Sequence, residues 1–486
     1  DGGGGDDGGV LPATREVLQH HGDLARSGAY VDPGLTRASV GDGGIHRDTT
    51  FAPTFTGQVY AQPLYFENGS GPDLVIAATE LNTVHAFSAQ DGSLVWQRTL
   101  PVAMTSSALP CGNIGPSHGI TGTPAIDAAG RALYLSAMVG VGSGPPVAHH
   151  QVFGLSLNDG AVLPGWPQDM NATAVASGTG FTSNVQGERS ALTFLGGTVY
   201  VPYGGLAGDC GTYHGWVVGI PAANPSAVQS WATRAGRSGI WAVGGLASDG
   251  TSLYAATGNA TGGSGYGDQE SVLRLGQGPT YSQQDVDRYT PSDWLNLDNG
   301  DTDISGSGPV LVDLPGSNPS ALVVQLGKNG DAYLLNRTNL GGQGGHLQQI
   351  HVANSSIIQA ATVYRTTQGT YVALAGTGAG CPNGTSGDLV ALKVNPGSPP
   401  SLSVAWCALG RGRGSPISTT TDGSSEAMVW TVSTNDGHLR AFHGDTGQLL
   451  YTSADTMTGL HSFMTPILAK GRIFIAADGR VYAYTR

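Results

Sequence analysis

The chain has 486 residues, of which 77 are glycine and only 12% are charged, and its formal net charge is −13. A glycine share about twice the usual one, spread through apolar runs, predicts many turns and few long helices. The acidic balance argues against a nucleic-acid partner, because phosphate binding needs clustered lysine and arginine. No apolar run in the sequence approaches the roughly 18 residues of a membrane span.

Residues 1–9 contain only glycine and aspartate, a composition typical of a solvated tether. We predict that residues 1–17 form a flexible linker and that residues 18–486 form one folded domain. Such a tether typically follows the lipidated cysteine of a surface lipoprotein. That cysteine is not in the sequence, so a lipid anchor would lie upstream of residue 1.

The four cysteines form no Cys-x-x-Cys pair and no haem attachment motif. An even count in a glycine-rich, lysine-poor β protein indicates two disulfides and an oxidising compartment. The local pairing joins Cys381 to Cys407, which leaves Cys111 for Cys210. Four buried thiols in a cytosolic protein remain the alternative.

From Phe55 onward, a pattern of four short strands repeats along the chain. Each copy begins with a turn of small residues and a first strand, often marked by proline, as in Gln62-Pro63-Leu64-Tyr65 and Thr465-Pro466-Ile467-Leu468. An apolar second strand follows, as at residues 74–78, and then an alternating third strand, as at residues 84–87. A turn leads to the fourth strand, as at residues 91–96.

Eight such copies occur, at intervals of roughly 50 to 65 residues, which predicts an all-β fold: an eight-bladed β-propeller of four-stranded antiparallel blades. The last copy ends at Arg486 after its third strand. Its fourth strand must then come from the N-terminal part of the chain, and residues 50–55 are the predicted segment. Such pairing would close the ring and remove the free sheet edges.

The unit from Val84 to Trp96 resembles the tryptophan-docking repeat of the eight-bladed quinoprotein dehydrogenases, in which an alanine and a tryptophan hold adjacent blades together. The match is good at Trp96 and partial at three further positions, and tyrosine replaces tryptophan in the seventh copy: Trp166, Trp231, Trp406 and Tyr451. Non-catalytic relatives such as outer-membrane assembly scaffolds use similar blades. The resemblance therefore implies the architecture more specifically than it implies catalysis.

In the fourth copy the resemblance extends to a cofactor site. Trp241 precedes the first strand and resembles the tryptophan on which pyrroloquinoline quinone (PQQ) stacks in these dehydrogenases. Asn259, in Ala-Thr-Gly-Asn after the second strand, resembles their metal-ligating asparagine. The alternatives without a cofactor are that Trp241 only packs in the channel and that the polar residues nearby form turns.

Two aspartates follow this site, after Thr290-Pro291-Ser292-Asp293-Trp294, a segment that also resembles the family. Asp301 and Asp303 resemble the pair of the lanthanide-using branch, in which the first is the catalytic base and the second a metal ligand. Lys328, before Asn329-Gly330, resembles the residue that contacts the quinone. Oxygen ligands such as these suit hard cations, either calcium or a lanthanide.

The sequence also departs from the family. No adjacent cysteine pair is present, and Asp209 stands where the family has a metal-binding glutamate. His118 and His214 stand where cofactor-binding arginines are expected, and a neutral imidazole holds a carboxylate less well than a guanidinium does. Arg189, ahead of the third blade, is the residue that could compensate.

The leading hypothesis is a PQQ- and metal-dependent enzyme that oxidises an alcohol or sugar hydroxyl in a secreted, periplasmic or cell-surface location. A cation beside the quinone would make it electrophilic while a carboxylate removes the alcohol proton. Without a haem motif, electrons must pass to a separate, unknown acceptor.

Two alternatives remain open. The first is a cofactor-free propeller that serves as a binding or assembly scaffold. The second is a transition-metal enzyme that uses His118, His214 and His461, which would meet at one end of the channel if each precedes a first strand.

Overall fold

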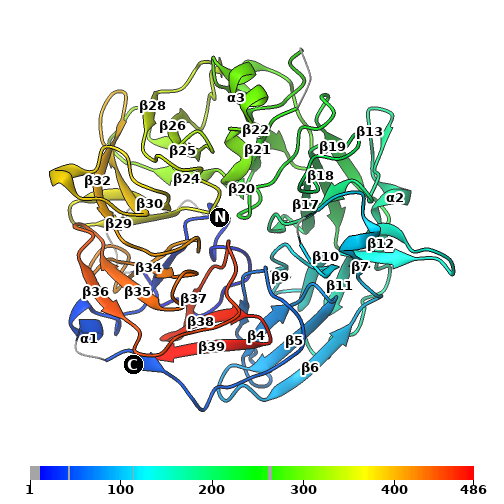
Figure 1. The fold of residues 1–486 in the computed structure, drawn as a ribbon, viewed down its shortest axis with the longest axis horizontal. Coiled ribbons are helices and arrows are strands. Elements are labelled where there is room, and N and C mark those ends of the chain that lie inside the picture. The colour runs from blue at the N-terminus through cyan, green and yellow to red at the C-terminus, as the bar shows by residue number, and fades with distance from the viewer. Residues whose placement is uncertain (1–10, 42–43, 113, 261–264) are drawn as a thin grey trace.

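The computed structural model describes residues 11–41, 44–112, 114–260 and 265–486. These residues form eight radial sheets around a central axis, as Figure 1 shows. The sheets are mainly four-stranded and antiparallel, so the predicted all-β, eight-bladed propeller is confirmed.

The strands of blades 1 to 4 follow one another along the chain. Blade 1 has β3 (Leu64–Phe66), β4 (Leu74–Ala78), β5 (Thr83–Ser88) and β6 (Leu94–Thr99), and blade 2 has β9 (Ala125–Asp127), β10 (Ala132–Val141), β11 (Val147–Ser156) and β12 (Gln168–Asp169). Blade 3 has β15 (Gln186–Gly187), β16 (Thr193–Leu195), β17 (Thr198–Gly205), β18 (Trp216–Pro221) and β19 (Gln229–Ala232). Blade 4 has β20 (Ala247–Ser248), β21 (Ser252–Thr257), β22 (Ser271–Gly276) and β23 (Arg288–Thr290), with β27 (Gly342–Gln343) added in parallel.

Blades 5 to 8 complete the ring. Blade 5 has β24 (Val310–Asp313), β25 (Ala321–Leu326), β26 (Asp331–Asn336) and β28 (Gln348–His351), and blade 6 has β29 (Thr362–Thr366), β30 (Gly369–Ala375), β31 (Leu389–Asn395) and β32 (Ser401–Ala408). Blade 7 has β33 (Ile417–Thr420), β34 (Met428–Val432), β35 (Leu439–His443) and β36 (Leu449–Thr452), with β1 (Ala29–Val31) parallel to β33. Blade 8 has β37 (Ile467–Ala469), β38 (Arg472–Ala477), β39 (Arg480–Thr485) and β2 (His46–Arg47).

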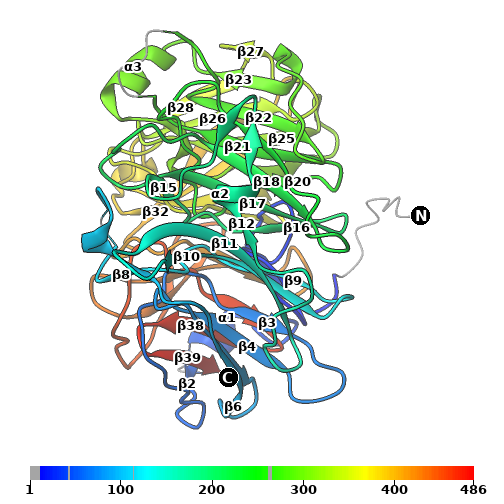
Figure 2. The same cartoon turned by 90° about the vertical axis from the view of Figure 1, so that its right-hand side faces the viewer.

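The remaining elements are short and lie in the connections. They are β7 (Met104–Thr105), β8 (Ser117–His118), β13 (Val175–Ala176), β14 (Thr179–Gly180), α1 (Arg37–Gly41), α2 (Met170–Thr173), α3 (Trp294–Gly300), η1 (Ser106–Ala108), η2 (Asp285–Asp287), η3 (Ile304–Gly306) and η4 (Pro382–Gly384). Figure 2 shows β8 and α3 on the same side of the ring in edge view. In the part of the chain that the structure covers, none of the helices is long and apolar enough to cross a membrane.

The ring is closed by the N-terminal chain, as predicted, but the bounds of the closing strand were wrong. The strand β2 is His46–Arg47, which pairs with Tyr484 and Thr485 of β39. Of the predicted residues 50–55, Thr54 forms an isolated bridge with Arg480. The turn that Asp48 caps, through its contacts with Thr50, separates the two pairings and shortens the strand.

The alanine–tryptophan repeat is visible as a recurring register. Ala86 lies opposite Trp96, and Ala391 lies opposite Trp406, each beside a one-residue shift of the ladder. Trp96 Nε1 donates to Leu157 O of blade 2 at 2.8 Å, and Trp406 Nε1 donates to Gly444 O of blade 7 at 2.8 Å. Each indole therefore joins its blade to the next one along the chain.

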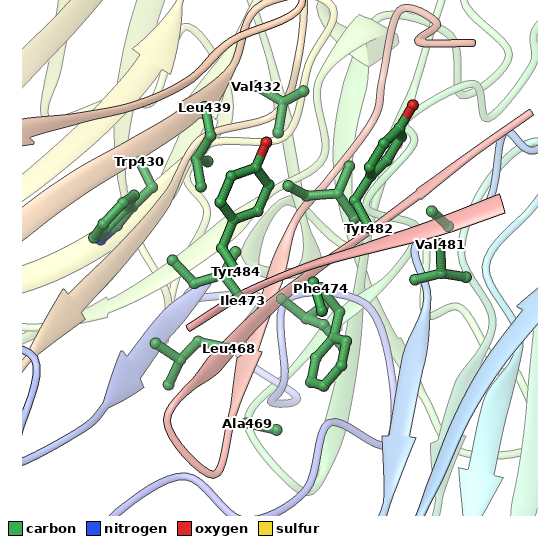
Figure 3. Packing of buried hydrophobic residues seen from close by; sticks show 14 of the residues in the cluster. Trp430, Val432, Leu439, Leu468, Ala469, Ile473, Phe474, Val481, Tyr482 and Tyr484 are labelled. Atoms are coloured by element: carbon green, nitrogen blue, oxygen red, sulfur yellow. The ribbon is translucent and has the colours of Figure 1, made fainter. Parts of the chain in front are cut away.

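Apolar side chains between neighbouring blades form the core. Figure 3 shows part of the cluster around blade 8, where Leu439 of blade 7 lies near Tyr484 of blade 8, and Trp430 and Phe474 belong to the same cluster. All four residues are at most 1% exposed. The same cluster includes Tyr65, Val75 and Phe87 of blade 1, so the last blade packs on the first through the same kind of apolar interface.

Residues 14–28, which we call the central segment, bond to the inner part of every blade. Backbone bonds join it to seven blades, through Tyr65, Ile126, Ser248, Leu311, Val363, Ser418 and Lys470. The eighth contact is to blade 3, where Arg26 Nη2 donates to Leu192 O at 3.0 Å. Of the predicted linker, residues 1–10 lie outside the described residues, while residues 11–17 bond to blades 1, 7 and 8.

Arg26 is the most connected side chain of the central segment. It is 1% exposed, and its guanidinium donates to the carbonyls of His20, Leu192 and Leu246 and to Thr193 Oγ1. Burial lowers its pKa to about 10, so the charge is retained at neutral pH. A buried cation held by four acceptors therefore joins the central segment to blades 3 and 4.

We expect Arg26→Met to lower the free energy of unfolding by about 3 kcal/mol, because four buried acceptors lose their donor. Urea unfolding followed by circular dichroism measures the change. Arg15→Met is the matched control: its side chain is 65% exposed, and the loss of a surface ion pair should cost less than about 1 kcal/mol. Equal losses in the two variants would contradict a special role for Arg26.

Candidate functional site

A cavity of about 560 Å³ opens at the end of the central channel where the first strands begin. The central segment bonds to residues further along those same strands, so it closes the other end. Each of the eight blades supplies lining residues, among them Tyr60, His118, Glu188, Arg189, Asp209, Trp241, Asn259, Asp301, Lys328, Ile358, Arg413, His461 and Phe463. A volume of this size is typical of small-molecule sites.

Trp241 forms a flat platform in this cavity. A β-carbon at Gly204, Gly239 or Gly258 would lie 2.6–2.7 Å from the indole, so the ring rests directly on glycine backbone. Its Nε1 donates to Gly205 O at 2.9 Å, which fixes the plane of the ring. The side chain is half-buried and lines the cavity, so the other part of the indole surface is available to a ligand.

Lys328 lies between the two predicted aspartates. Its Nζ is 2.8 Å from Asp301 Oδ1 and 2.6 Å from Asp303 Oδ2. Burial opposes protonation of this amine, but the carboxylates outweigh it and raise the pKa of Lys328. The structure therefore brings all three predicted residues together as one ion-pair cluster.

The two aspartates differ in exposure although they are only two residues apart. Asp301 follows the end of α3 in the left-handed conformation, with φ at 50°, and its side chain is 69% exposed. Asp303 is 0% exposed, and its Oδ1 accepts from the backbone and hydroxyl of Ser305 at 3.0 and 2.9 Å. Only Asp301 of the pair lines the cavity.

Two further acids lie behind this cluster. Glu270 Oε2 accepts from Ile304 N at 3.0 Å, and Asp298 Oδ1 accepts from Ala260 N, next to the predicted ligand Asn259. Burial raises the pKa of Asp298, and burial together with the charge of Asp303 raises the pKa of Glu270 well above its usual range. Within the described residues, Glu270 Oε1 and Asp298 Oδ2 are buried without a hydrogen-bond partner.

Arg189 and Arg413 form a basic wall on another side of the cavity. Arg189 Nε donates to Trp241 O at 2.7 Å, and its guanidinium carbon lies 5.1 Å from the centre of the Phe463 ring. Neither arginine takes part in an ion pair with any residue for which the structure gives side chains. Two guanidiniums without carboxylate partners, in a chain of net charge −13, favour an anionic ligand.

The three predicted histidines do not converge. His118 and His461 line the cavity, and burial lowers the pKa of His118 to about 4. His461 Nε2 lies 2.8 Å from both carboxylate oxygens of Asp478, and its ring stacks on Tyr60. His214 was misplaced by the prediction: it lies ahead of β18, a third strand, where its Nδ1 contacts Thr233 O at 2.8 Å, and it is not among the cavity residues.

Asp209, the predicted substitute for a metal-binding glutamate, lines the cavity on the blade 3 side. Its Oδ1 accepts from the Tyr213 hydroxyl at 2.6 Å. The neighbouring Cys210 is bonded to Cys111, and Cys381 is bonded to Cys407, so both predicted disulfides are confirmed. The first disulfide ties the loop of Asp209 to the loop before β8, two parts of the rim of the cavity.

Two of the three predicted metal ligands, Asp209 and Asp303, already contact other side chains of the chain. Across the described ranges, no group of three or more histidine, cysteine, aspartate or glutamate side chains is placed to hold a metal ion. Asp209 is bonded to Tyr213, and Asp303 contacts Lys328. The transition-metal alternative lacks its third histidine, because His214 contacts Thr233 and does not line the cavity.

Sequence reasoning missed Glu188, which lies directly before Arg189 in the lining of the cavity. It is 3% exposed, its Oε2 accepts from Gly122 N at 3.3 Å, and its Oε1 is buried without a partner among the described residues. Burial raises its pKa well above the ordinary 4.5. A glutamate just ahead of a buried first strand could have marked this site in the sequence, because its carboxyl group would be buried away from water.

Comparisons with known proteins show the fold alone. No protein-family model matches the chain, and no curated protein matches it in sequence. A solved structure described as a europium-containing methanol dehydrogenase has a TM-score of 0.61 at 13% identity, covering 97% of this chain and 98% of its own. The Myceliophteria thermophila Cps50 (Swd1) β-propeller domain, at 10% identity, covers 90% of this chain and 99% of its own, and the computationally designed Ika8 protein, at 13%, covers 89% and 98%; both have TM-scores of 0.41.

We expect Glu188→Gln to stabilise the protein at pH 7 but not at pH 4. The folded chain holds this proton more tightly than the unfolded chain. Each pH unit above the ordinary 4.5 therefore costs about 1.4 kcal/mol, until the pH reaches the folded pKa. Thermal unfolding at the two pH values measures the difference.

Glu67→Gln should have the opposite effect at pH 7, because hydrogen bonds from Arg15 and Lys470 lower the pKa of Glu67 to about 2. No pH dependence of the Glu188→Gln effect would contradict a neutral Glu188.

Proposed function

We propose that this protein is an oxidoreductase that uses PQQ to oxidise an alcohol or sugar hydroxyl. The observation that carries the proposal is the indole of Trp241, which rests on a glycine floor in a cavity that Arg189, Arg413 and Lys328 also line. The likeness to the europium-containing methanol dehydrogenase supports it at the level of the fold. The earlier alternative, a packed tryptophan that fills the channel, does not explain the cavity above the ring.

The cavity residues fit PQQ, a flat tricyclic quinone with carboxylates on its edge. Trp241 would hold its face, because an aromatic platform binds a flat ring by stacking. Arg189 and Arg413 would hold its carboxylates, since a guanidinium matches a carboxylate with two parallel donors. Lys328 lines the same cavity, and its ammonium would contact a quinone oxygen.

Bound PQQ would supply the acceptor for the hydride that leaves the substrate carbon. Asp301 is placed to take the proton of the substrate hydroxyl, because it lines the cavity and is exposed. Asp303 has no exposed surface, so we assign it the task of holding Lys328 in position. A proton acceptor set beside the reacting hydroxyl typically contributes 10²–10⁴-fold to the rate.

The predicted calcium or lanthanide ion fits this cluster in donor type but not in arrangement. Asn259, Asp301 and Asp303 offer oxygen atoms, as hard cations require. The ammonium of Lys328 already contacts both carboxylates, so an ion could reach them only after Lys328 had moved away.

We place the protein in a secreted, periplasmic or cell-surface location, because its two disulfides fit an oxidising compartment. Oxidation of each substrate releases two electrons, so a separate electron acceptor must be a partner. In an assay, an artificial dye replaces the electron acceptor, and candidate alcohols can then be compared.

Reconstitution with PQQ tests the proposal. We expect PQQ to quench tryptophan fluorescence at micromolar concentration, and Trp241→Ala to weaken this binding at least tenfold, because base-like stacking on an aromatic ring is worth about 1–3 kcal/mol. Trp231→Ala is the control, since Trp231 lies on the outer strand β19 and does not line the cavity. Asp301→Asn should retain PQQ binding and lose dye-linked alcohol oxidation by 10²–10⁴-fold.

Absence of PQQ binding by the unaltered protein would contradict the proposal. The cofactor-free binding or assembly scaffold would then be the better account of the same fold. Binding without oxidation of any alcohol or sugar would instead contradict only the substrate class.

A further inference from the structure

We propose that Lys328 is the resident cation of the acidic cluster, and that a metal ion and Lys328 exclude each other at Asp301 and Asp303. This inference builds on the proposed function, because it names what supplies positive charge beside the quinone. It differs from the metal-dependent hypothesis drawn from the sequence. It predicts that the protein works without a metal ion and that loss of Lys328 creates a site for one.

The first argument is the geometry of the ion pairs. Nζ of Lys328 lies 2.6 Å from Asp303 Oδ2 and 2.8 Å from Asp301 Oδ1, which is the position a cation shared by both carboxylates would take. The contact with Asp301 is a charge-assisted hydrogen bond, and the contact with Asp303 is an ion pair. A calcium or lanthanide ion bound to the same oxygens, at roughly 2.3–2.6 Å, would lie on the ammonium group.

The second argument concerns Asp303, which cannot lose its partner without replacement. Its side chain is 0% exposed, and its other oxygen is already used by Ser305. An isolated buried carboxylate is strongly unfavourable, so Asp303 requires either Lys328 or another cation. One cation is enough to neutralise Asp303, and Lys328 supplies it.

The third argument is the unused donor capacity around the cluster. Glu270 Oε1 and Asp298 Oδ2 are buried and have no partner within the described residues, and both side chains are at most 1% exposed. Asp298 contacts the backbone beside Asn259, and Glu270 contacts the backbone beside Asp303. Acceptor oxygens therefore remain without donors close to the two carboxylates that Lys328 neutralises, so removal of its ammonium leaves the cluster short of positive charge.

Terbium(III) is the probe, because an indole such as Trp241 sensitises its luminescence when the ion is bound nearby. We expect the unaltered protein to bind Tb³⁺ only weakly, with a dissociation constant above about 10 μM, and Lys328→Met to bind it at least tenfold more tightly. Asp303→Asn added to Lys328→Met should abolish the gain. None of these measurements requires turnover or PQQ.

Lys470→Met is the matched control. Lys470 Nζ also bridges two carboxylates, Glu67 Oε1 at 2.6 Å and Asp73 Oδ2 at 2.7 Å. These acids lie between β3 and β4, the first two strands of blade 1, and they do not line the cavity. We expect this variant to show no gain in Tb³⁺ luminescence or affinity, which separates a built site from the simple loss of one positive charge.

Two outcomes would overturn the inference. One is tight Tb³⁺ binding by the unaltered protein, which also decides the matter if Lys328→Met does not fold. The other is a folded Lys328→Met protein that binds Tb³⁺ no better than the unaltered protein. PQQ titration of the unaltered protein, with a chelator and with added metal, tests the proposed function separately. PQQ binding that requires added metal contradicts the role of Lys328. Absence of PQQ binding under both conditions contradicts the proposed function, and the Tb³⁺ result then decides on Lys328.

Discussion

Hydrogen bonds from the central segment to all eight blades are the constraint on which the site depends. A ring of eight sheets leaves an axial channel that its own short inner strands cannot fill. Here residues 14–28 occupy one end of that channel, with Arg26 donating to backbone of blades 3 and 4. The cavity is therefore left at the other end, where the loops ahead of the first strands carry polar side chains.

The positive charges of the cavity divide it into two regions. Lys328 is neutralised by Asp301 and Asp303, whereas Arg189 and Arg413 have no carboxylate partner in the described chain. Arg189 is half-buried and Arg413 is exposed, so this side of the cavity can attract an anion in a chain that has only 22 lysines and arginines against 35 acids. All three cations line the same cavity as Trp241.

Much of the fold could be predicted from sequence because it depends on local patterns. The Ala86–Trp96 register recurs as Ala391–Trp406 in blade 6 and as Ala441–Tyr451 in blade 7, and the Cys381–Cys407 pairing spans few residues. The rest depends on ring closure. Arg413 enters the cavity because blade 7 comes round to face blade 3, a proximity that no local pattern encodes. His214 was misplaced because a loop ahead of a third strand reads much like one ahead of a first strand.

Burial, rather than order along the chain, decides how the two aspartates differ. The left-handed turn after α3 directs Asp301 outward, and the two residues that follow return the chain to the core, so that Asp303 caps η3. A proton acceptor must exchange its proton with the ligand, which an exposed carboxylate can do and a sealed one cannot. The sealed carboxylate needs a permanent countercharge instead. The same two-residue spacing thus yields one group suited to chemistry and one suited to holding Lys328, and the second is what keeps the ammonium beside the first.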